Sequence, residues 1–307
     1  MQTTSTILMI EPICFGYNEQ TAENNYFQQN DNAQSSEIQA NALKEFQNMT
    51  QLLHKAGVKV IVVEDSAEPR TPDSIFPNNW ISFHDGGFIA VYPMFAPNRR
   101  QERRVEVVNA VVNQGFTIKE IFDFSAQENE GKFLEGTGSM VFDRVNRRAY
   151  AALSERTNED VLLDFCEKFD YTPVIFNAMQ TFEGKRLPVY HTNVVMSVGD
   201  KFAVVCLQSI DNEKERNLLK NSLLETQKEI IEISEAQMHN FAGNMLEIEN
   251  TKGEKIIALS QTAYNSLNNN QLQTLEKYGT LLPIAIPTIE KYGGGSVRCM
   301  MAEVFCN

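Results

Sequence analysis

The stretch VKVIVVEDSAEPRTPDSIFPNNWISFHDGGFIAVY, residues 58–92, carries the pattern that decides the fold. Residues 58–63 form an apolar run typical of a buried strand. A loop rich in proline and aspartate follows, and residues 80–84 and 88–92 are two short apolar runs joined by an Asp-Gly-Gly turn, which predicts a hairpin. Residues 37–56 precede the stretch with apolar side chains at helical spacing. The predicted unit is therefore a helix, a strand, a loop and a hairpin.

This unit recurs along the chain. In the five successive units, the first strand of the hairpin begins at positions 79, 138, 193, 244 and 296, at intervals of 59, 55, 51 and 52 residues. The pattern predicts helices over 101–113, 158–169, 212–225 and 262–277, and strands over 117–122, 171–176, 229–233 and 281–286. It predicts hairpins over 139–142 with 148–153, 193–198 with 201–207, and 244–249 with 255–260. A final strand is predicted over 296–305, and the opening strand 7–10 could complete its unit.

Five near-equal units favour an α/β fold closed around a pseudo-fivefold axis. A closed ring leaves no unpaired sheet edge and gathers equivalent loops near one axis. An ordinary α/β sheet with antiparallel strands is the alternative. The closed arrangement uses the full length, so we expect residues 1–307 to form a single domain rather than two.

Composition excludes several classes of protein. The chain has 42% hydrophobic and 22% charged residues, as in folded soluble proteins, and a net charge of −13. An acidic chain of this kind is not expected to bind nucleic acid non-specifically or to dock on anionic lipid. No apolar run is long enough for a membrane-spanning helix, and the run at residues 7–10 is too short for a signal peptide. We therefore expect a cytoplasmic protein.

The five cysteines have irregular spacing and include no CxxC pair, so neither a disulfide framework nor a zinc site is expected. Cys299 differs from the others because it follows the segment Gly293-Gly-Gly-Ser-Val-Arg298, whose glycines allow the backbone to approach a ligand closely. We expect the remaining four to be packing residues, namely Cys14, Cys166, Cys206 and Cys306.

Polar and reactive residues fall at the loop-to-hairpin junctions of different units. A cysteine attacks as its thiolate, a histidine can take up the thiol proton, and a carboxylate can orient that histidine. Taken singly, each also fits a structural role: a buried cysteine, a core histidine or a turn carboxylate. The junctions contain Asn79, Glu135, His191, Asn193, Asn244 and Cys299.

Arginines cluster in the Pro97-Asn-Arg-Arg segment, where Arg99 or Arg100 could form a planar fork for a carboxylate. There is no P-loop, GxSxG or HExxH motif, and the carboxylates show no metal-like spacing. The sequence therefore predicts no metal ion and no organic cofactor.

Taken together, the five units, Glu135-Gly136, His191-Thr-Asn193 and the segment ending at Cys299 resemble the arginine deiminase and amidinotransferase superfamily. Its fold is the five-bladed α/β propeller called the pentein fold. Three segments, Phe-Pro-Asn-Asn-Trp, Pro-Asn-Arg-Arg and Gly-Gly-Ser-Val-Arg-Cys, resemble more specifically the citrulline-utilisation hydrolase branch of amidinotransferase-like proteins.

The resemblance implies a role for each matching residue. Cys299 matches the nucleophile, His191 the general acid and base, and Glu135 the catalytic carboxylate. Substrate-binding positions are implied at Asn79, Asn193, Arg99 or Arg100, and at Asn244 in the fourth unit. Arginine deiminases carry aspartates that hold a guanidinium at two of these positions, where this chain has Asn79 and Asn193.

This double departure predicts a different substrate group. A guanidinium offers only donors and a positive charge, whereas a neutral ureido group has a carbonyl acceptor and N–H donors that an asparagine amide can match. We expect hydrolysis of a small amino acid, citrulline, to ornithine, ammonia and carbon dioxide through a covalent Cys299 intermediate. Open alternatives are an arginine deiminase, an amidinotransferase, a non-catalytic binding protein on the same scaffold and a structural α/β interaction protein. The sequence leaves a homo-oligomer open.

Overall fold

The computed structural model describes residues 1–31 and 33–305, and within these ranges the strands form five three-stranded sheets and one separate hairpin. In each three-stranded sheet the middle strand runs antiparallel to one neighbour and parallel to the other. The sheets are β17 (Ala302–Glu303), β1 (Thr6–Glu11) and β2 (Lys59–Glu64); β3 (Ile81–His84), β4 (Phe88–Val91) and β5 (Glu120–Asp123); β6 (Val141–Asp143), β7 (Arg148–Ala152) and β8 (Thr172–Phe176); β11 (Met196–Val198), β12 (Phe202–Val205) and β13 (Glu229–Glu232); and β14 (Leu246–Glu249), β15 (Lys255–Ser260) and β16 (Thr280–Ile284).

The first and last strands of the chain share one sheet. Leu8 of β1 lies opposite Ala302 of β17 in antiparallel register and opposite Ile61 of β2 in parallel register. This confirms the prediction that the opening strand completes the fifth unit.

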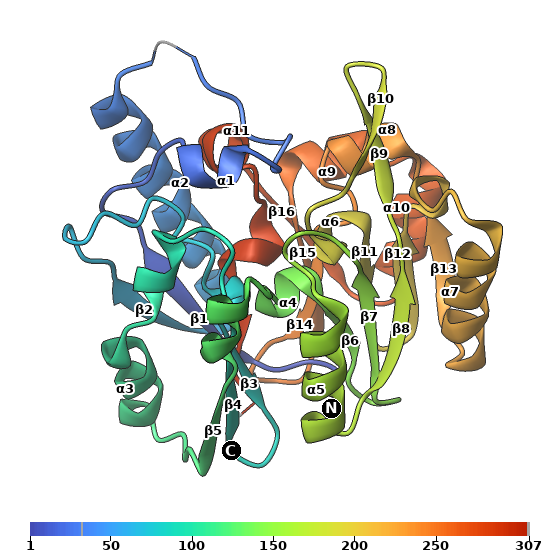
Figure 1. Ribbon diagram of the computed structural model, residues 1–307, viewed down its shortest axis with the longest axis horizontal. Helices are drawn as coiled ribbons and strands as arrows, with labels where there is room; N and C mark the ends of the chain where they lie inside the picture. Colours follow the sequence, from blue (N-terminus) through green and yellow to red (C-terminus); the bar gives the residue numbers. More distant parts are fainter. Residues whose placement is uncertain (32, 306–307) are drawn as a thin grey trace.

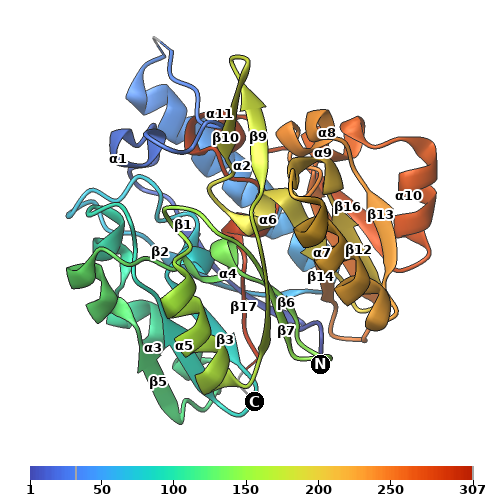
Figure 2. The ribbon, with the colours of Figure 1, turned by 45° about the vertical axis from the view of Figure 1, so that its right-hand side comes forward.

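The longer helices lie at the periphery of these sheets (Figures 1 and 2). In α2 (Ser35–Lys55) the side chains of Ile38, Ala42, Phe46 and Met49 are buried at helical spacing and pack against Ile7 and Met9 of β1 in one cluster. The other helices of seven or more residues are α3 (Val105–Asn113), α5 (Glu159–Phe169), α7 (Glu213–Glu225), α10 (Asn269–Glu276) and α11 (Pro287–Gly293).

Two predicted helices are wrong in their bounds. Instead of one helix over 262–277, α9 (Gln261–Ser266) and α10 are separated at Asn268, whose side chain caps α10 by accepting from the Gln271 backbone N–H. Instead of one helix over 101–113, a 3-10 turn, η2 (Arg99–Glu102), precedes α3. Arg99 bonds to Glu102 within that turn, which buries both side chains.

Other elements lie where the sequence pattern predicts only loops. These are the helices α1 (Glu19–Ala22), α8 (Glu235–His239) and α11, and the hairpin of β9 (Met179–Phe182) and β10 (Lys185–Pro188), which projects from the body in both views. The predicted final strand over 296–305 is confirmed only at β17. The residues before β17 include a 3-10 turn, η5 (Val297–Met300), held by a hydrogen bond from the Cys299 backbone N–H to the Ser296 carbonyl.

In four of the units a short helical turn lies where the sequence predicts the start of the first hairpin strand, and the strand itself follows this turn. These turns are η1 (Pro77–Asn79), α4 (Gly136–Ser139), α6 (Thr192–Val195) and η5, and a turn at residues 241–243 holds the equivalent place in the fourth unit. In space η1 contacts both η5 and α4, and α4 contacts α6. Figure 1 shows α4 and α6 in the interior of the view. The reactive residues of different units therefore lie close together.

Within the described residues, no helix is both long and apolar enough to cross a membrane.

Candidate active site

Cys299 lies in η5 behind a glycine loop that follows α11. Gly294 adopts a left-handed conformation with φ of +61°, which favours glycine. A Cβ on Gly293 or Gly295 would lie 2.9 Å from the ring of Phe76, so these glycines allow the loop to press against that ring. The Cys299 side chain is buried.

The sulfur of Cys299 accepts two amide hydrogen bonds. The Nδ2 atom of Asn244 is 3.2 Å from Sγ, and Nδ2 of Asn193 is 3.4 Å from it. The backbone N–H of Arg298 donates to Asn244 Oδ1 at 3.1 Å, which directs the amide nitrogen toward the sulfur. The Asn193 and Asn244 positions predicted from sequence thus meet at the predicted nucleophile.

His191 and Glu135 form a buried pair. His191 Nε2 is 2.8 Å from Glu135 Oε2. Burial lowers the pKa of His191 to about 4, against the opposing effect of Glu135, so the imidazole is neutral near pH 7. Gly138 is essential to this packing, because a Cβ there would lie 2.8 Å from the imidazole and 2.4 Å from Asn79 Nδ2.

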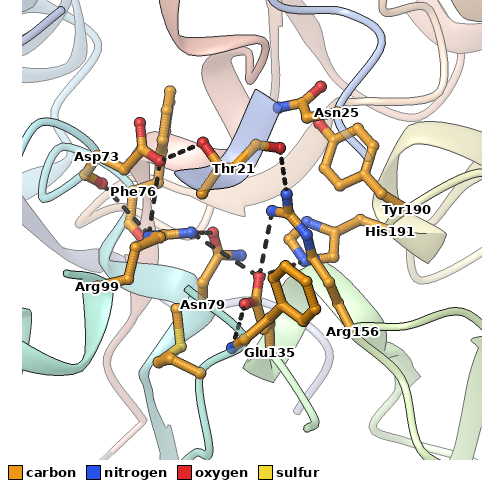
Figure 3. Close-up of polar contacts among 12 residues, drawn as sticks. Thr21, Asn25, Asp73, Phe76, Asn79, Arg99, Glu135, Arg156, Tyr190 and His191 are labelled. Atoms are coloured by element: carbon orange, nitrogen blue, oxygen red, sulfur yellow. Dashed lines mark hydrogen bonds and ion pairs between the residues drawn. The ribbon is translucent and has the colours of Figure 1, made fainter. Parts of the chain in front are cut away.

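Two arginines hold Glu135 in its ionised form. Burial raises the pKa of a carboxyl group, but Arg156, the His191 hydrogen bond and Arg99 outweigh it and lower the pKa of Glu135 to about 2. The Arg156 guanidinium is 3.6 Å and the Arg99 guanidinium 3.9 Å from Oε2. Figure 3 shows both guanidinium groups directed at this carboxylate. The backbone N–H of Phe95 donates to the other oxygen at 3.0 Å.

Asn79 is oriented by Arg99. The guanidinium donates to Asn79 Oδ1 at 2.8 Å and to both oxygens of Glu102 at 2.9 and 3.0 Å. Arginine has only donors, so the amide atom facing it must be the oxygen, and the nitrogen is directed elsewhere. Asn79 Nδ2 is buried and has no hydrogen-bond partner among the described residues.

These residues enclose a small pocket that also contains groups not predicted from the sequence. Asp73 is buried, its Oδ2 accepts from Asn18 and Thr21, and its Oδ1 has no hydrogen-bond partner within the described part of the chain. Arg156 is buried beside the ring of Tyr190. The lining comprises Asn25, Asp73, Phe76, Asn79, Arg99, Arg156, Tyr190, His191, Gly293, Gly294, Gly295 and Cys299.

Sequence reasoning missed these two residues for different reasons. Asp73 lies in the same loop as Asn79, so its position in the sequence could have indicated a residue of the site. Arg156 follows β7 in no recognisable motif and is brought to the site only by the fold.

The N-terminal segment covers this pocket. Arg156 donates to the carbonyl of Thr21 at 2.8 Å and to the side chain of Asn24, and Gln28 donates to the carbonyl of Gly293 at 3.1 Å. The unfilled volume beneath is about 10 Å³, enough for roughly one water molecule. This volume is smaller than an amino acid, so a ligand of that size requires residues around the pocket to shift.

Arg100, also predicted to bind substrate, is directed away from the pocket. Its guanidinium donates to the carbonyls of Met94 and Phe95 and lies 3.5 Å from Glu128. The structure thus brings Arg99, and not Arg100, to the predicted site.

The remaining cysteines have ordinary surroundings where they are described. Burial raises the pKa of Cys166 to about 12 and that of Cys206 to about 11, which makes their thiols unreactive near neutral pH. Cys14 is partly buried and also free, and Cys306 lies outside the described residues. In the described part of the chain, no group of three or more His, Cys, Asp or Glu side chains is placed to share a metal ion.

Comparison with solved structures shows the same fold in other proteins. The apo form of ArgZ, an arginine dihydrolase from the ornithine-ammonia cycle in cyanobacteria, matches with a TM-score of 0.73 and 15% identity over 97% of this chain, which spans 40% of the ArgZ chain. The N-terminal domain of ArgZ, as an asparagine-to-serine variant covalently bound to a reaction intermediate, matches at 0.70 and 16% identity, with 97% of both chains covered. A cysteine-to-serine variant of the DDAH enzyme of Pseudomonas aeruginosa, complexed with citrulline, matches at 0.65 and 14% identity, covering 99% of this chain and all of that one.

Sequence comparison places the chain in a family. No curated protein sequence matches it. The family model described as N,N dimethylarginine dimethylhydrolase, eukaryotic, matches residues 11–306, which is nearly the whole chain. The chain therefore belongs to the N,N-dimethylarginine dimethylhydrolase family, within the arginine deiminase and amidinotransferase (pentein) superfamily.

Proposed function

We propose that this protein is a cysteine-dependent hydrolase of a ureido C–N bond and that its substrate is citrulline. The observation that carries the proposal is the unpaired amide nitrogen of Asn79, held in place by Arg99. A buried donor without a partner is costly unless a ligand supplies an acceptor. The carbonyl oxygen of a ureido group is such an acceptor, whereas a guanidinium carries only donors.

Asn193 supports the same assignment. Its amide nitrogen bonds to the Cys299 sulfur, and its Oδ1 is buried with no partner among the described residues. That oxygen can accept from the terminal NH₂ of a ureido group. A donor at Asn79 and an acceptor at Asn193 together match the carbonyl and the N–H groups of one neutral ureido group.

The charged ends of an amino acid also find partners. The unpaired Oδ1 of Asp73 can accept from an α-ammonium, and the buried Arg156 can donate to an α-carboxylate. Arg99, which the sequence suggested for the carboxylate, is occupied by Glu102 and Asn79, whereas Arg156, beside Glu135, has its other partners, Thr21 and Asn24, in the N-terminal segment that covers the pocket. We therefore assign Arg99 to orienting Asn79 and Arg156 to binding the substrate carboxylate.

The first chemical step breaks the bond between the ureido carbon and the side-chain nitrogen. The thiol of Cys299 gives its proton to His191, and the sulfur attacks the ureido carbon. Asn79 donates to the oxygen as negative charge develops on it. The carbon–nitrogen bond then breaks, His191 returns the proton to the departing amine, and ornithine leaves an S-carbamoyl group on Cys299. Glu135 stabilises the imidazolium between these transfers.

Hydrolysis of the carbamoyl group completes the cycle. His191 takes a proton from water, the resulting hydroxide attacks the carbamoyl carbon, and the carbon–sulfur bond breaks. The sulfur recovers its proton from His191. The released carbamic acid decomposes to ammonia and carbon dioxide, so the products balance citrulline plus water.

We further propose that the five sheets are the blades of one pentein propeller built from residues 1–307. The shared strand order of the sheets and the contacts between neighbouring short turns support this arrangement. A hydrogen bond from Asn244 to the Asn193 carbonyl joins the third and fourth units, and one from Arg298 to Asn244 joins the fourth and fifth. A cytoplasmic location remains a prediction from the sequence.

Purified protein incubated separately with citrulline and with arginine tests the activity. We expect ornithine and ammonia from citrulline, with Cys299→Ser inactive but folded. Consumption of arginine without citrulline turnover would support a deiminase or amidinotransferase and contradict the ureido assignment. Binding of citrulline without turnover would support a non-catalytic binding protein.

A further inference from the structure

The sulfur of Cys299 has an unusual set of neighbours for a nucleophile: two neutral amides. The Nδ2 atoms of Asn244 and Asn193 lie 3.2 and 3.4 Å from Sγ, and these are the hydrogen-bond partners of this sulfur within the described residues. All three side chains are buried. Amide N–H groups can donate to a thiolate, and they cannot be titrated away near neutral pH.

The orientation of the Asn244 amide is determined by its other contacts. Its oxygen accepts from the backbone N–H of Arg298 at 3.1 Å, and its nitrogen donates to the backbone carbonyl of Asn193 at 3.0 Å. With one hydrogen committed to that carbonyl, the second hydrogen of the NH₂ group is available to the sulfur. Asn244 contacts the nucleophile and a neighbouring turn, and both atoms of its amide are already paired, whereas Asn193 Oδ1 has no partner among the described residues.

Among residues 1–31 and 33–305, no cationic side chain is hydrogen-bonded to the sulfur. His191 is bonded through Nε2 to Glu135, and burial lowers the pKa of the imidazole to about 4. The guanidinium groups of Arg99 and Arg156 are engaged with carboxylates and carbonyls. A guanidinium substrate would bring its own positive charge to the sulfur. If the proposed function holds, however, the ureido substrate is neutral and brings none.

We propose that the amide groups of Asn244 and Asn193 stabilise the thiolate of Cys299, and that Asn244 serves the nucleophile rather than the substrate. When the S–H bond breaks, the proton passes to His191, and the negative charge left on sulfur is held by the two N–H donors. This inference rests on the proposed function in one respect only, namely that the substrate is neutral. The effect on the thiolate exists in the free enzyme.

The pH dependence of Cys299 alkylation in the absence of substrate tests the proposal. Iodoacetamide is added to the full chain over a pH series, and modification of the Cys299 peptide is quantified by mass spectrometry. Each rate is divided by its own high-pH plateau, so that differences in access to the buried sulfur cancel. We expect Asn244→Ala to move the midpoint up by about one pH unit, which is roughly a tenfold loss of normalised rate at pH 7.

Substitution by aspartate sharpens the test. Asn244→Asp keeps the shape of the side chain and an acceptor for Arg298, but it sets a carboxylate oxygen against the sulfur. We therefore expect a larger upward shift than with alanine. Asn212→Asp is the matched control: it adds the same charge at the N-terminus of α7, where the side chain only accepts backbone hydrogen bonds, and should leave the midpoint unchanged.

The outcomes separate this proposal from the proposed function. Unchanged midpoints in Asn244→Ala and Asn244→Asp, with a raised KM for citrulline, would overturn the proposal and return Asn244 to substrate binding. Shifted midpoints in a protein that does not hydrolyse citrulline would support the thiolate assignment and contradict the ureido one. If these variants do not fold, as judged by circular dichroism, Asn193→Ala serves in their place with the same expected upward shift, and an unchanged midpoint there would overturn the proposal.

Discussion

Replacing Asn79 by aspartate changes which substrate group the side chain at this position can bind, and it leaves the surrounding contacts in place. The Arg99 guanidinium donates to Asn79 Oδ1 at 2.8 Å, and a carboxylate oxygen at the same position accepts that hydrogen bond equally well. The second atom changes from an unpaired donor to an acceptor. The fold therefore tolerates Asn79→Asp, but the variant loses the donor to the ureido oxygen of the proposed substrate.

The magnitude follows from the role assigned to this nitrogen. Removing one donor to a developing oxyanion lowers kcat by about 10²–10³, or roughly 2.7–4 kcal/mol. The variant also sets a negative charge against the ureido oxygen, so we expect ornithine formation from citrulline to fall by at least about 100-fold. Cationic arginine should bind better to the variant than to the wild type, because a buried guanidinium requires a carboxylate partner.

Steady-state formation of ornithine from citrulline, with circular dichroism as a check on folding, measures this effect. Asn212→Asp again controls for the added charge and should retain full activity. A folded Asn79→Asp enzyme with the wild-type kcat and KM for citrulline would refute the assignment of Asn79 as the donor to the ureido oxygen.

Three further changes test other parts of the site. In Gly138→Ala a Cβ would lie 2.4 Å from Asn79 Nδ2 and 2.8 Å from His191, so we expect turnover to be lost and stability to fall by about 1–3 kcal/mol, whereas Gly16→Ala, with its nearest neighbour at 3.7 Å, should alter neither kcat nor Tm. Arg156→Lys, which loses the planar fork, should raise KM for citrulline more than it lowers kcat; a fall in kcat alone would argue against carboxylate binding. The pKa of His191 is lowered from 6.5 to about 4 by burial, so the unfolded chain takes up a proton in this window before the folded one does, and the free energy of unfolding should fall by roughly 3 kcal/mol as the pH drops from 6.5 to 4. Urea unfolding of His191→Asn should lack that portion of the pH dependence, and an unchanged pH profile would contradict the assigned burial effect.

The repeated unit could be predicted from sequence because its signals are local. The apolar runs of β2, β3 and β4 and the helical spacing in α2 are each patterns of residues close in the sequence, and glycines follow α2 and β3. The predicted final strand over 296–305 is too long because its first part has a partner distant in the sequence. Arg298 and Cys299 lie in a turn whose contacts include Asn244, from another unit.

The residues of the site also differ in whether the sequence could predict them. Glu135, His191 and Cys299 were predictable as types of residue at equivalent junctions, and the structure places their units in contact. The role of Asn244 was not predictable, because the hydrogen bond from its amide to the sulfur depends on the turn at Arg298. Arg156 gave no signal either, since only folding brings it within 3.6 Å of Glu135.

Arg99 and Arg100 illustrate a limit of reading neighbouring residues. They have the same side chain and adjacent positions, yet Arg99 is directed inward to Glu102 and Asn79, and Arg100 is directed at backbone carbonyls near Glu128. Which of two adjacent arginines enters a site depends on the path of the backbone through a short 3-10 turn. Composition and spacing do not specify that path.

The most direct test of the central claim is the mass of the covalent intermediate on Cys299. Wild-type enzyme mixed with citrulline is quenched in acid during turnover, and the Cys299 peptide is analysed by mass spectrometry, with Cys299→Ser as the blank. We expect the added mass of a single carbamoyl group, because the proposed reaction releases ornithine before the intermediate is hydrolysed. An adduct that retains the whole amino-acid side chain, or an amidino adduct that forms only with arginine, would contradict the account.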